Sequence, residues 1–188
     1  SNGQSVQLAS GTHVDAAAGL GGVAMTGSGE GVIAIASGAT VSGGAKQGYG
    51  VKFADTTSTY ALGSGAQYTL ENAGSIGALS DLAIAIDDTN GRQVTLNNYG
   101  DITGYLNAVN SNTTLNNYHT LNLRSFSDTN GDGERDTTQV ALLQFGEGDN
   151  QVNNAAGALI QLAAVQNAGA VDTTGMYSAQ GTKSIATA

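Results

Sequence analysis

One short block recurs along the chain and constrains the fold more than any other feature. Each copy has an apolar residue at both ends and Asn at its third position, and two copies have Gly at the fifth. The copies span 70–76, 96–102, 115–121 and, more loosely, 152–159, and they begin 26, 19 and 37 residues apart. Repeats of about 20–50 residues are typical of solenoids, in which each repeat forms one layer of a stack. The unequal spacing indicates layers joined by loops of different lengths.

A second block, with apolar ends and Ser-Gly at its centre, recurs in the N-terminal part. This order predicts a strand, a turn and a strand. Its copies are 8–14, 35–41 and 62–68, spaced by 27 residues. A third, weaker block alternates apolar with small or polar residues, as strands do. It occupies 22–25 and 50–53, and the runs 82–86 and 106–109 fit the same place.

The composition favours strands and tight turns over helices. The chain has 188 residues, of which 28 are Gly and none is Pro, Cys or Trp; 11% are charged, against about 25% in ordinary globular domains. Gly, Asn, Ser and Thr are weak helix formers, and Asn and Gly favour turns. The absence of Pro suits a parallel stack, because each inner strand there is hydrogen-bonded on both sides. We therefore predict an all-β chain, a right-handed parallel β-helix of about seven or eight coils.

Stacked coils about 4.8 Å apart place equivalent side chains above one another. This predicts two apolar columns, Leu70, Leu96, Leu115 and Val152, and Ile76, Ile102, Leu121 and Leu159. It also predicts an inward asparagine ladder of Asn72, Asn98, Asn117 and Asn154. Each buried amide group without a partner would cost about 1–3 kcal/mol, but stacked Asn side chains can satisfy one another. The alternative is that the Asn-Asn pairs mark exposed turns.

The segment 95–104 follows the pattern apolar, x, Asn, x, Gly, x, Ile, x, Gly. It resembles the repeated motif of autotransporter passenger domains, and repeats of this style extend from about Leu8 to about Val165. The resemblance implies a right-handed β-helix exported by type V secretion and displayed on, or released from, a Gram-negative cell surface. It also implies a membrane barrel elsewhere in the full-length chain. Similar strings occur in haemagglutinin-type exoproteins, phage tail proteins and glycan-cleaving enzymes.

Charge and segment composition exclude several classes of partner. The net charge is -9 and the isoelectric point is near 4.2, so the surface repels phosphate backbones and anionic lipids, and we expect no nucleic-acid binding. No apolar run approaches the roughly 18 residues of a membrane span, so we expect no membrane insertion of this segment. We treat 1–188 as one segment of a longer passenger, with 169–188 expected to form a fraying end or a cap.

Catalytic motifs are weak. His13 and His119 fall at positions expected to be exposed turns, and neither lies near a nucleophile motif. Nothing matches the Gly-Asp-Ser-Gly motif of serine protease passengers. Asp87 and Asp88, followed by Arg92, resemble faintly the paired Asp residues and Arg of β-helical pectinolytic enzymes, but an exposed turn explains them better. We therefore predict that the chain is not an enzyme.

The expected function is adhesion, aggregation or host contact by a surface passenger segment. Its partners would be a host surface protein, a glycan, or a second copy of the chain. Tyr99 and Tyr118 occupy equivalent block positions, which predicts a small exposed stack. Such a stack either binds glycans or pairs for stability alone. A glycan-active β-helical enzyme and a purely structural stalk remain the alternative functions.

An acidic insertion at 128–137 matches the start of a calcium-binding loop. Its expected ligands are the side chains of Asp128, Asn130 and Asp132, the backbone carbonyl of Glu134, and Asp136 directly or through water. The twelfth position is Gln139 where an EF-hand has a bidentate Glu, and no flanking helices are predicted, so we expect modest affinity. The alternative is a solvated surface turn. No other cofactor is predicted.

Calcium titration tests this loop. If the carboxylates converge on one ion, calorimetry at millimolar Ca²⁺ should show heat of binding, and the loop should become ordered. A titration that releases no heat in this range would contradict the calcium site.

Overall fold

The computed structural model describes residues 3–27, 29–55, 67–87, 92–109, 111–124, 142–162, 177–179 and 183–187. Among these residues every element of regular structure is a β-strand. The all-β part of the fold prediction is thus confirmed for the described residues. The same ranges contain no helix with the length and apolarity that crossing a membrane requires.

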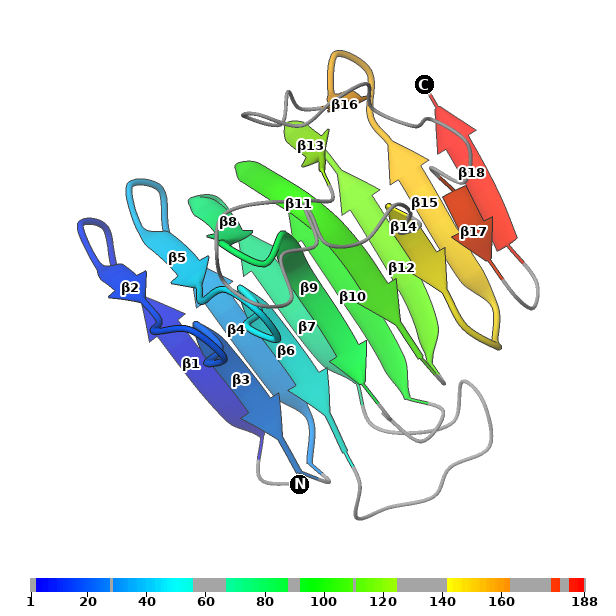
Figure 1. The fold of residues 1–188 in the computed structure, drawn as a ribbon. Coiled ribbons are helices and arrows are strands. Elements are labelled where there is room, and N and C mark those ends of the chain that lie inside the picture. The colour runs from blue at the N-terminus through cyan, green and yellow to red at the C-terminus, as the bar shows by residue number, and fades with distance from the viewer. Residues whose placement is uncertain are drawn as a thin grey trace.

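Seven strands form one sheet, here called sheet A, in which all neighbours are parallel. In spatial order they are β1 (Gln4–Leu8), β4 (Gly31–Ile35), β7 (Tyr68–Asn72), β10 (Gln93–Asn98), β12 (Asn112–Asn117), β15 (Asn150–Asn154) and β18 (Lys183–Thr187). Figure 1 shows these strands side by side, with their arrows pointing the same way. They follow one another from the N-terminal end of the molecule to its C-terminal end. Each strand therefore pairs with the equivalent strand of the next repeat.

The other eleven strands form a second sheet made of two parallel ladders that share one long strand, β11 (Asp101–Ala108). Ladder B contains β2 (His13–Asp15), β5 (Thr40–Gly43), β8 (Ser75–Ala78), the first half of β11, β13 (Thr120–Leu123) and β16 (Leu159–Leu162). Ladder C contains β3 (Val23–Thr26), β6 (Val51–Ala54), β9 (Leu82–Asp87), the second half of β11, β14 (Leu143–Phe145) and β17 (Tyr177–Ala179).

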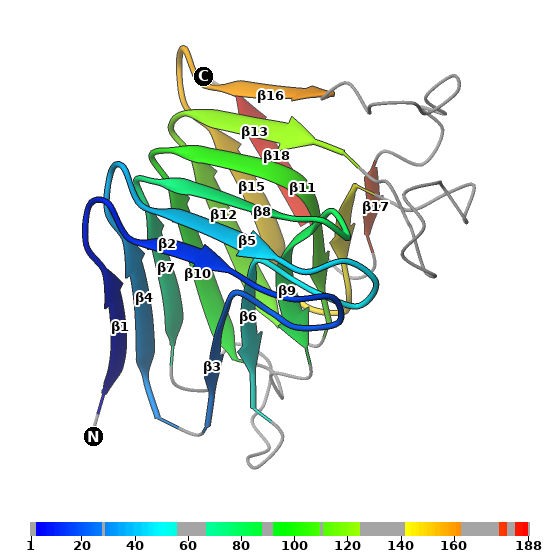
Figure 2. The same ribbon diagram turned by 60° about the vertical axis from the view of Figure 1, so that its left-hand side comes forward.

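The two halves of β11 meet at Gly104, which has φ +134°. This backbone conformation suits Gly, and a Cβ at this position would collide with the carbonyl oxygen of Asp81. In Figure 2 the strands of sheet A, ladder B and ladder C form three rows of one body. This arrangement is consistent with the predicted parallel β-helix. Within 169–188, β17 and β18 add one strand each to ladder C and sheet A.

The interior is built from columns of equivalent side chains, as expected from the sequence. The first predicted apolar column is confirmed: Leu70, Leu96, Leu115 and Val152 lie in register and are at most 1% exposed. The second column holds Ile76, Ile102 and Leu121, but its fourth member is Ile160. Leu159 pairs instead with Thr120 and is 52% exposed. The prediction for Leu159 was wrong because the preceding turn is two residues longer than its equivalents.

The third copy of the N-terminal block, 62–68, was also misaligned. Ile35 of the second copy is in register with Asn72, and Val41 is in register with Ile76. Tyr68, the last residue of the expected third copy, pairs with Gly31 instead. The two block families are therefore one series, in which the turn shortens and Asn replaces the apolar residue before it.

The alternation of buried and outward positions predicts how substitutions in β12 affect stability. Leu115→Ala should lower the free energy of unfolding by about 2–5 kcal/mol, because it empties an interior position. Its neighbour Thr114 faces outward, so Thr114→Ala should cost about 1 kcal/mol or less. Urea denaturation of both variants measures the difference. Equal losses would contradict the inward assignment of this column.

Candidate functional site

The turns between sheet A and ladder B form a continuous feature, here called the A–B corner. It comprises 72–75, 98–101, 117–120 and 154–159. Its inner side is the predicted asparagine ladder, which the structure brings together. The side-chain amide Nδ2 of Asn72 donates to Oδ1 of Asn98 at 2.8 Å, Asn98 donates likewise to Asn117 at 2.8 Å, and Asn117 donates to Asn154 at 2.7 Å. Asn72, Asn98 and Asn117 are at most 1% exposed.

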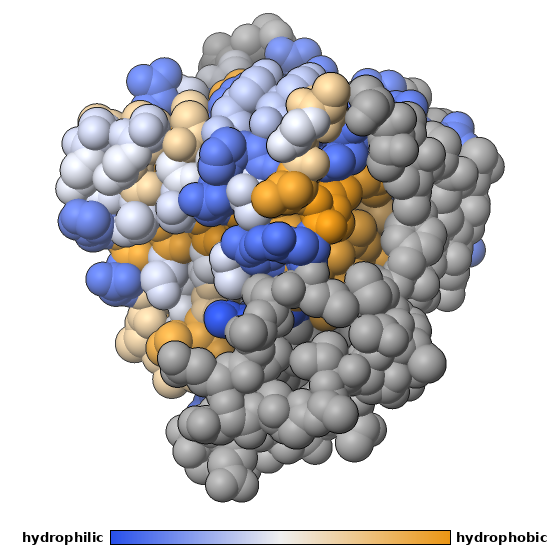
Figure 3. Space-filling view, turned by 90° about the horizontal axis from the view of Figure 1, so that it is seen from above, coloured by the Kyte–Doolittle hydropathy of each residue, from blue (hydrophilic) through white to orange (hydrophobic). Residues whose placement is uncertain are grey.

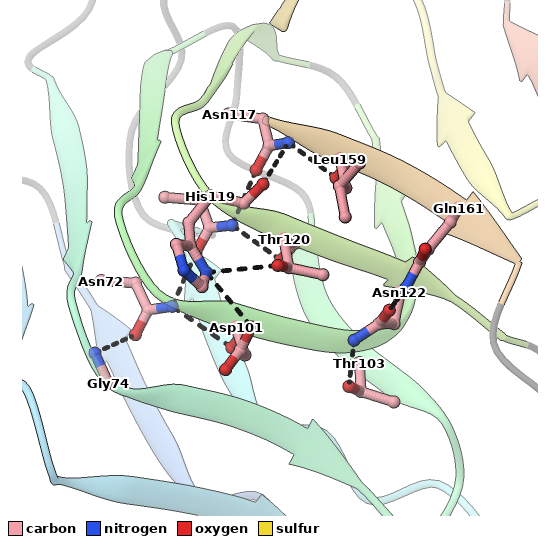
Figure 4. Close-up of polar contacts among 11 residues, drawn as sticks. Asn72, Gly74, Asp101, Thr103, Asn117, His119, Thr120, Asn122, Leu159 and Gln161 are labelled. Carbon is pink, nitrogen blue, oxygen red and sulfur yellow. Dashed lines mark hydrogen bonds and ion pairs between the residues drawn. The ribbon is translucent and has the colours of Figure 1, made fainter. Parts of the chain in front are cut away.

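The amides of Asn72, Asn98 and Asn117 also donate to a backbone carbonyl just after the turn of the next repeat. The amide of Asn154 donates within its own turn, to the carbonyl of Ala158. The Nδ2 of Asn98 donates to the carbonyl of Thr120 at 3.0 Å, and that of Asn117 donates to the carbonyl of Leu159 at 3.0 Å. Oδ1 of Asn72 accepts the backbone N–H of Gly74 at 3.2 Å. Figure 4 shows these bonds following the corner from one repeat to the next. The ladder thereby satisfies backbone groups that a two-residue turn leaves without partners.

The residue before the turn differs between the first two repeats and the later ones. Before the two-residue turns 73–74, 99–100 and 118–119, the inward residue is Asn. The four-residue turns 9–12 and 36–39 follow Leu8 and Ile35 instead, and they close with their own backbone bonds, such as Thr12 N–H to Ala9 C=O at 3.1 Å. Longer turns can use a Gly at positive φ, here Gly11 and Gly38 at +81°. The last turn, 155–158, combines both features: it has four residues and Gly157 at φ +81°, and it still follows Asn154.

The Gly residues of the short turns are required for a reason other than positive φ. Neither Gly74 nor Gly100 has a positive φ. A Cβ on Gly100 would collide with the carbonyl oxygen of Gly74, and a Cβ on Gly74 would collide with that of Ala39. Close approach between successive turns, rather than backbone conformation, requires Gly here.

A second amide ladder lies on the outer face of sheet A. The Nδ2 of Asn153 donates to Asn116 at 2.8 Å, Asn116 donates to Asn97 at 2.9 Å, and Asn97 donates to Oε1 of Glu71 at 2.7 Å. These bonds point toward the N-terminal repeats, opposite to those of the buried ladder. The outer ladder therefore ends on the carboxylate of Glu71. The prediction named only the inward Asn of each pair, although strand alternation implies that the adjacent residue faces outward.

Tyr99 and Tyr118 form the predicted exposed stack at the edge of the A–B corner. Their ring centroids are 4.7 Å apart, their planes differ by 4°, and they are 50% and 47% exposed. The pKa of Tyr99 is raised by desolvation, then by the nearby Glu71 carboxylate and by Tyr118. The negative charge of the Glu71 carboxylate thus influences the phenol group of Tyr99.

His119 completes the corner next to the tyrosines. Its Nδ1 lies 3.3 Å from Oδ1 of Asp101 and 3.2 Å from the hydroxyl of Thr120. Both His119 and Asp101 are about half exposed (57% and 50% of the side chain), which agrees with the expected exposed turn. On the adjoining outer face of ladder B, Gln161 donates to Asn122 at 2.6 Å. Figure 4 shows this polar surface beside the buried ladder.

Arg92 was expected to lie in an exposed turn, and this expectation was wrong. Its side chain is fully buried, and its Nε donates to Oδ2 of the equally buried Asp55 at 3.0 Å. The guanidinium also bonds to the carbonyl of Gly29 at 2.7 Å and lies 4.3 Å from the ring centroid of Tyr68. Asp87 pairs with Lys52 at 2.8 Å instead. The structure therefore places Asp87 and Arg92 in separate ion pairs.

The predicted calcium ligands Asp128, Asn130, Asp132, Glu134 and Asp136 lie outside the described residues. Within the described ranges, no group of three or more His, Cys, Asp or Glu side chains converges as metal ligands would. The calcium site stays a prediction. Comparison of this chain with protein-family models, with curated proteins and with solved structures gives no match.

The two amide ladders predict opposite sensitivities at neighbouring positions. Asn98→Leu should lower the free energy of unfolding by about 3 kcal/mol, because the Asn72 amide and the Asn117 carbonyl oxygen would lose buried partners. Asn97→Ala removes only solvent-accessible bonds and should cost about 1 kcal/mol or less. Chemical denaturation measures both changes. A smaller loss for Asn98→Leu than for Asn97→Ala would refute the structural role of the inner ladder.

Proposed function

We propose that this chain is a segment of a right-handed parallel β-helix of about seven or eight coils, acting in adhesion, aggregation or host contact at a Gram-negative cell surface or after release from it. The seven parallel strands of sheet A support this coil number. The resemblance of 95–104 to passenger-domain repeats supports export. We propose no catalytic role.

The observation that carries the proposal is the pair of half-exposed tyrosines held on stacked strands. Exposed aromatic rings supply large contact area with little loss of conformational entropy on binding. The rings lie beside the outer amide ladder, so apolar and hydrogen-bonding groups are presented together. Rigid parallel strands keep these groups in place before a partner arrives, which lowers the entropic cost of association.

Three acidic side chains of the described residues lie beside basic side chains, which does not favour the alternative of a glycan-active enzyme. Asp81 pairs with Arg124 at 2.6 Å and Asp101 lies 3.3 Å from His119, while Asp87 pairs with Lys52. Glycosidases instead use two carboxyl groups that face the scissile bond together. A stalk remains the second alternative, and it differs from an adhesin only in having no binding surface of its own.

An attachment assay separates an adhesin from a stalk. Beads coated with the 188-residue chain should attach to cultured epithelial cells or to one another several times more often than beads coated with heat-denatured chain. The double variant Tyr99→Ala, Tyr118→Ala should fall to about the denatured level, because it removes the central aromatic contacts.

A matched control is Leu79→Ala, which removes an exposed apolar side chain (66% exposed) from the turn between β8 and β9. Figure 3 shows that hydrophobic residues also reach the surface of the face seen from above. Attachment by the control should stay at the unsubstituted level. If the native chain attaches to neither cells nor other beads above the denatured level, the adhesion proposal fails and the stalk is favoured.

A further inference from the structure

The stacked tyrosines occupy the middle of a column whose other members are small. Successive residues after the sheet A strands are Ala36, Ala73, Tyr99, Tyr118 and Ala155, as the register of the preceding residues shows. The backbone N–H of Tyr99 bonds to Asn72 and that of Tyr118 bonds to Asn98, so the layers are contiguous here. Each ring therefore has one face against its partner and one face toward an alanine.

The spacing between the rings equals the spacing between layers. The centroids are 4.7 Å apart with a tilt of 4°, and parallel strands are separated by about 4.8 Å. A third flat group stacked on the outer face of Tyr99 at this distance would lie over Ala73. The side chain of Ala73 is exposed and ends at Cβ, so this layer has space that a larger residue would fill.

Hydrogen-bonding groups border this space on the sheet A side. The Glu71 carboxylate is close enough to Tyr99 to raise its pKa, after the larger effect of desolvation. One oxygen of Glu71 accepts a bond from Asn97 at 2.7 Å. A carboxylate has about four acceptor positions, so Glu71 can still accept hydrogen bonds from a ligand. The space thus combines an aromatic face with a hydrogen-bond acceptor at its rim.

The adjoining surface favours a neutral ligand rich in hydroxyl groups. The outward residues of β7, β10, β12 and β15 are Thr69, Glu71, Gln93, Thr95, Asn97, Asn112, Thr114, Asn116, Gln151 and Asn153. Only one of these is charged, so a highly basic partner would find little charge complementarity. A pyranose ring has a flat face of weakly positive C–H groups, which suits the negative face of an aromatic ring. Its rim carries hydroxyl donors for carboxylate and amide oxygens.

We propose that the outer face of Tyr99, above Ala73 and beside Glu71, is a subsite for one saccharide ring. This inference rests on the proposed adhesive function and names the class of ligand that this surface would bind. The ring stacks parallel to Tyr99 as a third member of the aromatic column. Its rim hydroxyls donate to Glu71 and reach the outer amide ladder.

Substitutions on the two sides of the tyrosine pair provide matched variants. Ala73→Tyr places a third ring over Tyr99 and occupies the subsite, whereas Ala155→Tyr covers Tyr118 and leaves the subsite open. Both changes add the same side chain at positions in register, Ala73 in a two-residue turn and Ala155 in a four-residue turn. Circular dichroism and thermal unfolding should report folded proteins for both. Tyr99→Phe keeps the aromatic face, and Tyr99→Ala removes it.

The test is binding of each variant of the 188-residue chain to an array of immobilised neutral and acidic oligosaccharides. The unsubstituted chain should bind at least one saccharide class. Ala73→Tyr and Tyr99→Ala should weaken that binding by about tenfold or more, whereas Ala155→Tyr and Tyr99→Phe should stay within about threefold. Binding should depend weakly on salt, because a stacked neutral ring contributes little screened charge attraction.

Two results on the array would overturn the subsite: no saccharide retained by the unsubstituted chain, or saccharide binding that Ala73→Tyr leaves unchanged. A third would be that the chain binds no saccharide but binds a basic probe, polylysine, and that salt abolishes this binding. The bead assay, repeated on cells stripped of surface glycans by glycosidases, separates this inference from the adhesive function. Attachment that survives glycan removal and Ala73→Tyr sinks the saccharide subsite while adhesion stands. If the native chain attaches to neither cells nor beads, the adhesion proposal is wrong. The oligosaccharide array then still tests the saccharide subsite independently.

Discussion

Parallel pairing in register is the constraint on which the rest of this structure depends. It places each inward side chain directly over its equivalent in the next layer, so a column must be made of residues that pack against copies of their own kind. Leu and Ile do so by burying apolar surface, about 25 cal/mol for each Å² removed from water. Asn does so through an amide that is both donor and acceptor. An ionised aspartate in the same column would lack the donor, so the identity of Asn72 and Asn98 follows from stacking itself.

The same constraint links turn geometry to side-chain chemistry at the A–B corner. A two-residue turn brings successive turns so close that Gly100 meets the carbonyl of Gly74. It also leaves backbone carbonyls inside the corner, and the Asn amides bond to them. The four-residue turn after Ile35 closes with its own backbone bonds, whereas the four-residue turn after Asn154 has both a backbone bond and the amide. Each two-residue turn of the A–B corner follows an Asn, and Asn154 shows that a longer turn accepts one as well.

The columns could be predicted from the sequence because period-2 alternation and repeated blocks act locally. Asn72 and Asn98 were placed correctly for this reason. The misplacement of 62–68 came from the connection between β6 and β7, which spans 55–67, whereas the equivalent connection between β3 and β4 spans only 27–30. The longer connection moves the next repeat along the sequence without changing its local pattern. Arg92 could not be read correctly, because its burial depends on Asp55, 37 residues earlier and one repeat away. The spacing of Asp55 and Arg92 in the sequence does not indicate that these two residues pair. The outer ladder, in contrast, could have been predicted from the alternation of side chains along the strands, but it was not predicted.

Parallel register aligns the outward side chains of successive layers as well as the inward ones. The inward side chains stabilise the fold, whereas the outward ones are available for recognition. Side chains facing the interior, such as Leu96, are held by packing on every side, so their replacement disturbs neighbouring layers. Outward positions such as Asn97 and Tyr99 contact mainly their equivalents in adjacent layers and solvent. They can change one at a time with small cost to the fold, because surface substitutions usually shift stability by about 0.5 kcal/mol or less. A stack of this kind can therefore vary its binding surface while the buried columns stay constant, and the tyrosine pair among alanines is one such variation.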